Sequence, residues 1–402
     1  MNKRGHHHSD FSPGGTPASS PRLSPEGATA MDVSTSVHFR RATNSKSAPA
    51  PFSQFPFPNS FSHLLGILLS LPLVLPSSLY AQTTPVESIL EDRVVKSCER
   101  GIAYLAQIQR TDGAIVKGQY PNVCTALSCM ALMASGHFPG RGKFGKNLER
   151  GILWLAKQAD AKGYFGKDGG RMYGHGMCTL ALTEAYGMLR SRRDNMKVRD
   201  VLEKAVNVIV GSQAKSGNHN GGWRYNPTPG DSDLSVTAWQ VQALRGAQNC
   251  QIPIPRDTIA RAIEYISRCY HRGAKGFGYQ PGGGPTEPMR SAGVVLMHTL
   301  KEGERDIVKE AGESLLQRSF GKWGGSYYFY QNFYSATAGL MLGERGETKI
   351  NIPIEKTLIA HQRQDGSWPA APGGHGAGEA YYTAFSCLIL AARYQYLPIY
   401  QE

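Results

Sequence analysis

The strongest constraint on the fold of this chain is an internal repeat. Six segments each begin with an amphipathic helix pattern, pass through a loop rich in glycine and aromatic residues, and enter a second helix pattern that opens with small residues. Successive second patterns start 54, 58, 55, 44 and 47 residues apart. They begin at Thr125, Thr179, Thr237, Ala292, Ala336 and Thr383. Periods of this length are typical of architectures in which each unit buries its apolar face against its neighbours.

The two helices of each repeat differ in polarity. The first helices carry one apolar stripe, such as Val95, Cys98 and Ile102, and their other faces carry Lys, Arg and Glu. The second helices, for example residues 125–133 and 383–392, are apolar nearly all round, and such a helix must be buried on every side. Six amphipathic helices that alternate with six buried ones predict an all-α fold, an α6/α6 toroid with an outer ring around an inner one.

The loops between the two helices share a second pattern. Residues 362–368 read Q-x-x-x-G-x-W, and residues 109–115 are a weaker copy that ends in Ile115. Degenerate forms follow Gln158 and Gln213. A buried glutamine can bond free backbone groups at helix ends, and a tryptophan can stack over it. We therefore interpret this motif as structural.

The motif, followed by T-A-x-x-x-x-A-L at the start of the second helix, resembles the repeat of terpenoid cyclases and protein prenyltransferase subunits. The squalene–hopene-cyclase type is the most similar, and the resemblance covers residues 91–397, approximately. It implies a single toroid of six helical hairpins. It also implies a central cavity for an isoprenoid or other apolar ligand, and a terpenoid cyclase-like or prenyltransferase-like activity in an enzyme.

One acidic segment bears on that activity. Class II terpene cyclases use a D-x-D-D motif in which a central carboxylic acid protonates an alkene. This chain reads Asp231-Ser232-Asp233-Leu234, so leucine fills the third acidic position and the motif is incomplete. The resemblance implies that Asp233 would be the general acid and Asp231 its hydrogen-bond partner. The competing interpretation of Asp233 is a helix N-cap.

In a toroid the inner helices run in one direction, so their N-terminal ends meet at one mouth of the barrel, where helix dipoles make the potential positive. Residues around the starts of the inner helices are therefore candidate substrate-binding residues, and tyrosine faces there would stabilise cationic charge. The candidates are Tyr120, Tyr173, His175, Arg290, Tyr330, Tyr334, Glu379, Tyr381 and Tyr382. No metal site and no cofactor is predicted, because H-E-x-x-H, Asp-x-Cys and Walker A motifs are absent from the sequence.

Three functional hypotheses follow. The first is an exported terpenoid-cyclase-like protein that binds an isoprenoid or other apolar small molecule in its central cavity, with catalysis left open by the incomplete acid motif. The second is a non-catalytic exported scaffold or binding protein, which predicts a barrel interior filled by side chains. The third is a polysaccharide-active α/α barrel, which needs two opposed carboxylates roughly 5–10 Å apart. Asp233 and Glu379 are the candidate pair for that reaction.

The N-terminal part of the chain lies outside the repeats. Residues 1–61 are rich in Ser, Pro, Gly and Ala and are predicted to be a disordered leader, with Met31 as an alternative start. Residues 62–81 contain an apolar run of twelve and then small residues, which predicts a signal peptide cleaved near Ala81. We expect a periplasmic or secreted toroid of residues 82–402. An uncleaved signal that anchors the chain in the membrane is the alternative.

Charge and cysteine content bound the partners. The chain has 44 Lys+Arg against 31 Asp+Glu, but no basic groove with interleaved aromatic residues, so a nucleic-acid partner is not expected. The densest basic cluster is interpreted as a solvated turn, or alternatively as a surface for an anionic membrane or polymer. It comprises Arg190, Arg192, Arg193, Lys197 and Arg199. The seven cysteines are scattered and odd in number, which indicates buried small hydrophobic residues rather than a disulfide framework.

Overall fold

The computed structural model describes residues 85–228, 230–374, 377–395 and 397–400. These residues belong to one compact unit, residues 78–402. The predicted leader (1–61), signal peptide (62–81) and cleavage point near Ala81 lie outside the described residues, and they stay predictions. Among the helices that are described, none combines the length and apolar character needed to cross a bilayer.

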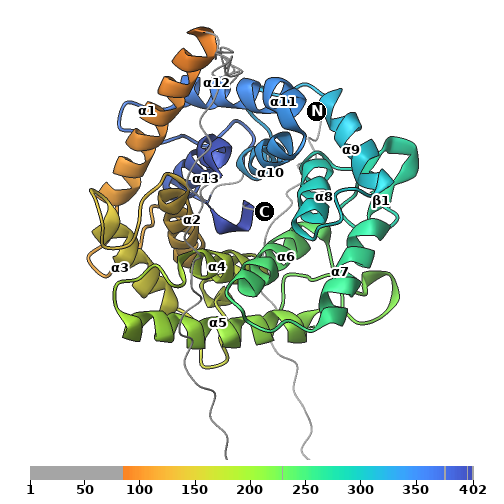
Figure 1. The fold of residues 1–402 in the computed structure, drawn as a ribbon, viewed down its shortest axis with the longest axis horizontal. Helices are drawn as coiled ribbons and strands as arrows, with labels where there is room; N and C mark the ends of the chain where they lie inside the picture. Colours follow the sequence, from red (N-terminus) through yellow and green to blue (C-terminus); the bar gives the residue numbers. More distant parts are fainter. Residues whose placement is uncertain (1–84, 229, 375–376, 396, 401–402) are drawn as a thin grey trace, which may run out of the picture. The chain divides into compact units, whose positions relative to one another are not determined.

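Two rings of helices form this unit, which confirms the predicted α6/α6 toroid (Figure 1). The inner ring consists of α2 (Pro121–Ala134), α4 (Arg171–Ala185), α6 (Leu234–Asn249), α8 (Glu287–Thr299), α10 (Tyr328–Met341) and α13 (Glu379–Ala391). The outer ring consists of α1 (Pro85–Gln107), α3 (Gly145–Ala156), α5 (Arg192–Ser212), α7 (Arg256–Arg268), α9 (Asp306–Leu316) and α12 (Ile352–His361). Each inner helix packs against the next, and α13 packs against α2, so the ring closes.

Short elements join these helices. The strands β1 (Tyr270–His271) and β2 (Gly276–Phe277) pair antiparallel in the loop between α7 and α8. The single turn α11 (Gly343–Gly346) and a π-helical turn (Glu347–Asn351) connect α10 to α12. The 3-10 turns are η1 (Gly166–Asp168), η2 (Gly217–His219), η3 (Arg272–Ala274), η5 (Ala392–Tyr394) and η6 (Pro398–Tyr400).

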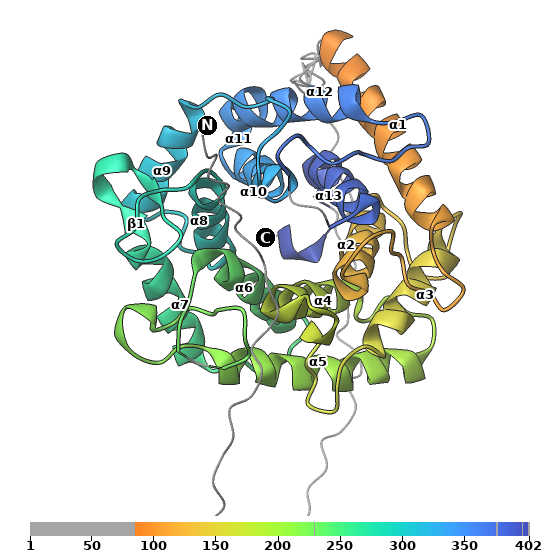
Figure 2. The same cartoon turned by 180° about the vertical axis from the view of Figure 1, so that it is seen from behind.

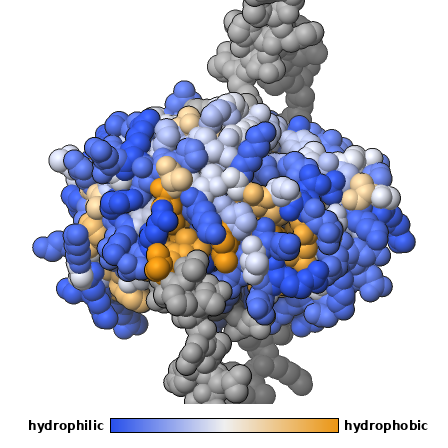
Figure 3. All heavy atoms as spheres, turned by 90° about the horizontal axis from the view of Figure 1, so that it is seen from above, coloured by the Kyte–Doolittle hydropathy of each residue, from blue (hydrophilic) through white to orange (hydrophobic). Residues whose placement is uncertain are grey.

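Burial follows the polarity of the two helix classes. Every residue of α2 from Asn122 to Ala134 is buried, as expected for a helix without a polar face. The outer helices turn a polar face to solvent, and the rim of the molecule is mostly hydrophilic with scattered apolar groups (Figure 3). All seven cysteines are free thiols, and every one except the half-buried Cys250 is buried, in agreement with their interpretation as small core residues.

Gln362 and Gln213 each link one outer helix to the next in the ring. The Gln362 amide, at the end of α12, donates to the carbonyl of Ser97 in α1 at 2.9 Å, and its oxygen accepts from the Ser97 hydroxyl at 2.7 Å. Gln213 makes the equivalent bond from the end of α5 to the Thr258 carbonyl in α7, at 2.9 Å. Because α1 and α12 come from opposite ends of the repeat array, Gln362 helps to close the ring.

The tryptophan of the motif connects the outer and inner helices. The Trp368 indole donates to the Leu358 carbonyl in α12 at 2.8 Å, and its backbone N–H donates to the Thr383 hydroxyl in α13 at 3.2 Å. This bond gives a reason for threonine at the start of an inner helix. Gly366 has a φ of +89°, and a Cβ there would lie 2.4 Å from the Arg100 carbonyl oxygen, so the loop needs glycine at this position.

Aromatic side chains fill the middle of the barrel. Trp239 of α6 stacks on Phe333 of α10 with ring centroids 5.5 Å apart and planes 10° apart. Tyr330, Tyr334 and Phe385 pack around Trp239 at centroid distances of 6.5, 6.0 and 6.4 Å. We call these five residues the aromatic layer. They extend from α6 and from α10 and α13, so they reach across the inner ring.

The chain turns back into the ring after α13 and η5, and we call the described residues 395 and 397–400 the C-terminal segment. Figures 1 and 2 show this segment inside the circle of inner helices. Leu397 and Ile399 are buried, with 4% and 7% of their surface exposed. The Ile399 N–H donates to the Glu184 carboxyl near the C-terminal end of α4 at 3.2 Å. The segment therefore closes the end of the barrel opposite to the N-terminal ends of the inner helices.

Candidate functional site

Asp233 is the N-cap of α6 and is completely buried. Its Oδ1 accepts from the Val236 N–H at 2.9 Å and from the Ser235 hydroxyl at 2.5 Å, and its Oδ2 accepts from Arg224 Nη1 at 2.8 Å. Burial raises the pKa of Asp233, while the bonds from Ser235, Val236 and Arg224 oppose that rise. The carboxylate thus caps the helix, as one interpretation of the sequence predicted, and also neutralises a guanidinium.

Asp231 lies in the same loop but is half exposed. Its Oδ2 accepts from Arg224 Nε at 3.0 Å, and its Oδ1 lies 3.2 Å from His219 Nδ1. The expected direct bond between Asp231 and Asp233 is replaced by a bridge through Arg224, because one planar guanidinium has enough donors for both carboxylates. Of the two aspartates, only Asp231 offers its oxygens to solvent.

Tyrosine rings surround this guanidinium. Arg224 Cζ lies 4.4 Å from the centroid of the Tyr225 ring, and Nη1 donates to the Tyr279 hydroxyl at 2.9 Å. The Tyr225 and Tyr279 hydroxyls are 2.8 Å apart. Tyr173 packs beside Tyr225 at 5.9 Å, and its hydroxyl bonds that of Ser235. We call this group the Arg224 cluster; its members are Tyr173, His219, Arg224, Tyr225, Asp231, Asp233, Ser235 and Tyr279.

The cluster is assembled by the N-terminal ends of α4 and α6, by the loop between α5 and α6, and by the loop that leads to α8. The sequence identified Tyr173, Asp231 and Asp233 as mouth residues but missed Arg224 and Tyr279. A signal for both was present, because Arg224 directly follows the repeat tryptophan and Tyr279 ends the corresponding glycine-rich loop of the next repeat. Both loops lead into inner helices, and the same reasoning would have placed them at the mouth.

Tyr330 and Tyr334 lie beneath the cluster. The Tyr330 hydroxyl donates to the Ser235 carbonyl at 3.1 Å, which joins the cluster to the aromatic layer. The Tyr334 hydroxyl accepts from the Gln242 amide at 2.7 Å and is fully buried. Both side chains therefore serve as packing under the mouth.

Tyr381 and Tyr382 belong to α13. The Tyr381 ring packs edge-on against Phe385 of the aromatic layer at 4.7 Å. The Tyr382 ring stacks on Phe329 at 5.0 Å. These two predicted binding residues contact aromatic neighbours rather than the Arg224 cluster.

His175 and Tyr120 are two further predicted site residues with local contacts of their own. His175 is buried between α4 and α5; its Nδ1 accepts from the Phe165 N–H at 3.4 Å, and its Nε2–H donates to the Ala205 carbonyl at 3.1 Å. Burial lowers the pKa of His175 to about 4, so the imidazole is neutral. Its ring lies in the core between the inner helix α4 and the outer helix α5, and not at the mouth. Tyr120 precedes α2 with a φ of +57° and is half buried.

The two predicted charged residues, Arg290 and Glu379, also bond elsewhere. Arg290 Nη1 donates to the Ala274 carbonyl at 3.2 Å. Glu379 is bound by Lys117 at 2.6 Å, by the Tyr104 hydroxyl at 2.7 Å and by Arg363 at 2.7 Å.

These bonds lower the pKa of Glu379 to about 2, and the bond from Lys117 has the largest effect. Glycoside hydrolysis needs one carboxyl that holds its proton near neutral pH. Glu379 is thus the ionised member of the predicted pair, and it shares no bonding partner with Asp233. Each of the two carboxylates is held by its own set of cationic and hydroxyl partners, so their role as a catalytic pair stays a prediction.

A metal centre is not formed by the residues that the structure describes, since they contain no group of three His, Cys, Asp or Glu side chains at ligand distance.

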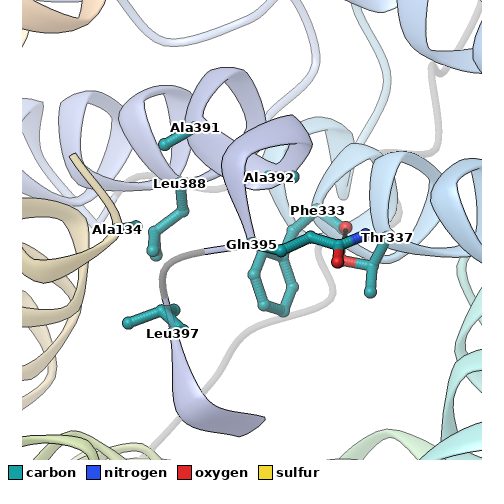
Figure 4. A pocket seen from close by; sticks show the side chains of 8 residues that line it. All are labelled: Ala134, Phe333, Thr337, Leu388, Ala391, Ala392, Gln395 and Leu397. Carbon is teal, nitrogen blue, oxygen red and sulfur yellow. Dashed lines mark hydrogen bonds between the residues drawn. The ribbon is translucent and has the colours of Figure 1, made fainter. Parts of the chain in front are cut away.

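The space expected to hold an apolar ligand is occupied by the aromatic layer and, at the far end, by the C-terminal segment. Between that segment and the inner helices remains a pocket of about 10 Å³ (Figure 4), which is enough for one water at most.

These observations define the chain as an α/α toroid protein, and comparison with solved structures agrees. The α-1,6-mannanase GH76A from Salegentibacter sp. HEL1_6 aligns with a TM-score of 0.56 at 10% identity, over 75% of this chain and 99% of the mannanase. Cellobiose 2-epimerase from Bacillus thermoamylovorans aligns with a TM-score of 0.56 at 11% identity, over 75% of this chain and 100% of the epimerase.

A type II terpene cyclase from Scytonema is also similar, with a TM-score of 0.48 at 12% identity, over 75% of this chain and 98% of the cyclase. No protein-family model matches the sequence, and no curated protein matches it. At these identities the likeness concerns the fold alone.

Proposed function

We propose that the protein binds a saccharide at the Arg224 cluster. The observation that supports this proposal is the combination of tyrosine faces with half-exposed, fixed polar groups around one guanidinium. Sugars present C–H faces that pack on aromatic rings and hydroxyls that bond carboxylates, guanidinium groups and amides. Binding sites for small polar molecules combine such aromatic walls with a few precisely placed polar groups.

Three side chains of the cluster are suited to contact sugar hydroxyls. Asp231 is 50% exposed, His219 38% and Arg224 27%, so each can reach a ligand. Arg224 is held by both aspartates and by Tyr279, and little conformational freedom remains for it to lose on binding. Asp233 is a positioning residue in this proposal, because it is buried and acts through Arg224.

The same geometry disfavours an isoprenoid at this mouth. Protonation of an alkene by Asp233 requires direct contact, but the Asp233 carboxylate is covered by Ser235, Val236 and Arg224. Export of the protein, expected from the predicted signal peptide, is part of this proposal, since it would bring the cluster into contact with extracellular or periplasmic glycans.

Isothermal titration calorimetry of the full chain with α-1,6-mannotriose and cellobiose tests the proposal. The names of the two structural neighbours suggest these probes. We expect one of them to bind, and Asp231→Asn and Tyr225→Ala to weaken binding about tenfold or more, as the loss of a charge-assisted bond or a stacking face predicts. Tyr327→Ala, at an exposed tyrosine before α10, is the matched control and should bind normally.

The melting temperature of each variant separates loss of binding from loss of fold. If neither probe binds, or if Asp231→Asn and Tyr225→Ala bind as tightly as the Tyr327→Ala control, the saccharide proposal is refuted.

A further inference from the structure

The far end of the inner ring is lined by apolar side chains of several inner helices. Ala134 ends α2, Thr337 lies in α10, and Leu388 and Ala391 lie in the second half of α13 (Figure 4). Phe333 of the aromatic layer lies at the inner end of this space. The lining is therefore that of an apolar chamber whose floor is the aromatic layer.

The chain's own C-terminal segment occupies this chamber. Gln395 and Leu397 line the remaining pocket together with α2, α10 and α13, while η6 packs against α6 and Ile399 bonds α4. Two apolar side chains, Leu397 and Ile399, enter the interior. The segment fills a space between five of the six inner helices in the way that a ligand would.

An ionisable group also lies at this largely apolar end. Glu184 of α4 is 2% exposed, and the Ile399 N–H donates to its Oε2 at 3.2 Å. Desolvation raises the pKa of Glu184 to about 8, so near neutral pH its carboxyl is mostly neutral. A buried carboxyl needs a bonding partner, and here the partner is the backbone N–H of Ile399.

We propose that the far end of the barrel is a binding site for a neutral long-chain amphiphile with one hydrogen-bond donor, such as an alcohol, and that the C-terminal segment occupies this site when no ligand is bound. The ligand's hydroxyl donates to Glu184 in place of the Ile399 N–H, and its alkyl chain takes the positions of Leu397 and Ile399. Bound ligand and seated segment exclude each other.

Charge decides the class of ligand. The C-terminal ends of the inner helices lie at this mouth, and their exposed carbonyls give it a negative potential. A carboxylate headgroup next to those carbonyls is repelled, whereas a neutral hydroxyl is accepted. The site thus favours an alcohol over the fatty acid of the same length.

This inference is independent of saccharide binding. The Arg224 cluster and the far chamber lie on opposite sides of the aromatic layer, and they share no residue. Either proposal can fail while the other holds, because their ligands and variants differ.

The test compares the full chain with a variant that ends at Gln395, by calorimetry with 1-decanol and with decanoate. We expect the shortened chain to bind decanol with a 1:1 stoichiometry, at least tenfold more tightly than the full chain, because its competitor has been removed. Decanoate should bind at least tenfold more weakly than decanol. Adding Glu184→Ala to the shortened chain should abolish the preference for decanol over decane.

A second variant guards against misfolding of the shortened chain. Leu397→Ser with Ile399→Ser keeps the full length but removes both apolar anchors, and it should also bind decanol more tightly than the wild type. Ile89→Ser, at an exposed apolar residue of α1, is the matched control and should leave binding unchanged. In the wild type, decanol should accelerate hydrogen exchange of the Ile399 amide and leave inner-helix amides protected.

Three results would overturn the proposal. One is a shortened chain that keeps the wild-type melting temperature but binds no decanol. Another is equal binding of decanol and decanoate. The third is loss of the folded state in both the shortened chain and the double variant, which would make the segment a permanent part of the core.

Discussion

Replacing Glu184 with glutamine should change how the stability of the protein depends on pH. In the folded chain, burial raises the pKa of Glu184 from 4.5 to about 8, against a smaller opposing effect of the Ile399 N–H. The folded state therefore holds the proton more tightly than the unfolded state between these two values. The stability that the protonated carboxyl provides is complete below pH 4.5 and is lost as the pH rises toward 8.

The magnitude follows from the two pKa values. At about 1.4 kcal/mol per pH unit, the interval from 4.5 to about 8 corresponds to a loss on the order of 5 kcal/mol. Glu184→Gln keeps an oxygen that accepts from the Ile399 N–H but cannot ionise. Relative to this variant, the wild type should lose stability steadily between pH 5 and 8.

Urea unfolding of both proteins at pH 5, 6.5 and 8 measures this difference. Subtracting the free energy of unfolding of the variant from that of the wild type removes the contribution of other titratable groups. His175 is one such group, because its lowered pKa makes the stability that it contributes decrease as the pH falls from 6.5 toward 4. Glu264→Gln, on the exposed side of α7, controls for the loss of one carboxylate. If the free energies of unfolding of the wild type and of Glu184→Gln differ by the same amount at all three pH values, the reasoning is refuted.

Two further pairs of substitutions test the site loop and the ring closure by urea unfolding. Asp233→Ala removes the cap of α6 and the buried partner of Arg224, and should cost about 3 kcal/mol, whereas Asp231→Ala, at a half-exposed carboxylate, should cost less than about 1 kcal/mol. Equal costs would contradict the structural role of Asp233. Gly366→Ala and Gly373→Ala both place alanine at a positive φ, +89° and +73°. Only the Cβ added at position 366 would meet a backbone oxygen, at 2.4 Å. Gly366→Ala should therefore destabilise the protein by several kcal/mol more than Gly373→Ala. Similar melting temperatures for the two variants would show that the loop does not pack against α1 as described.

Much of the fold could be predicted because its causes are local and repeated. An apolar stripe on one helix and an apolar surface all round the next define an outer and an inner helix before any contact is known. The Gln362–Trp368 motif recurs in recognisable form, so its structural role was correctly inferred. Asp233, placed directly before an apolar helix, could be interpreted as a cap from its position alone.

The sites depended on contacts that no local pattern reveals. His175 and Arg290 were expected at the mouth, yet the rotation of each helix about its axis turns their side chains toward other neighbours. The position of Arg224 after the repeat tryptophan would have placed it at the mouth, but no sequence pattern shows that its guanidinium joins both aspartates. Only the packed structure identifies which side chains share one guanidinium.

The sequence by itself determined that this chain forms two concentric rings of helices, because the repeat sets the number of hairpins and polarity sets their layers. The tertiary structure alone decided what fills the rings. Whether a barrel is hollow depends on the summed volume of side chains from all six inner helices, and here Trp239 and Phe333 meet across the centre. The C-terminal segment reaches Glu184 over a separation of 215 residues, a contact that exists only once the ring has closed.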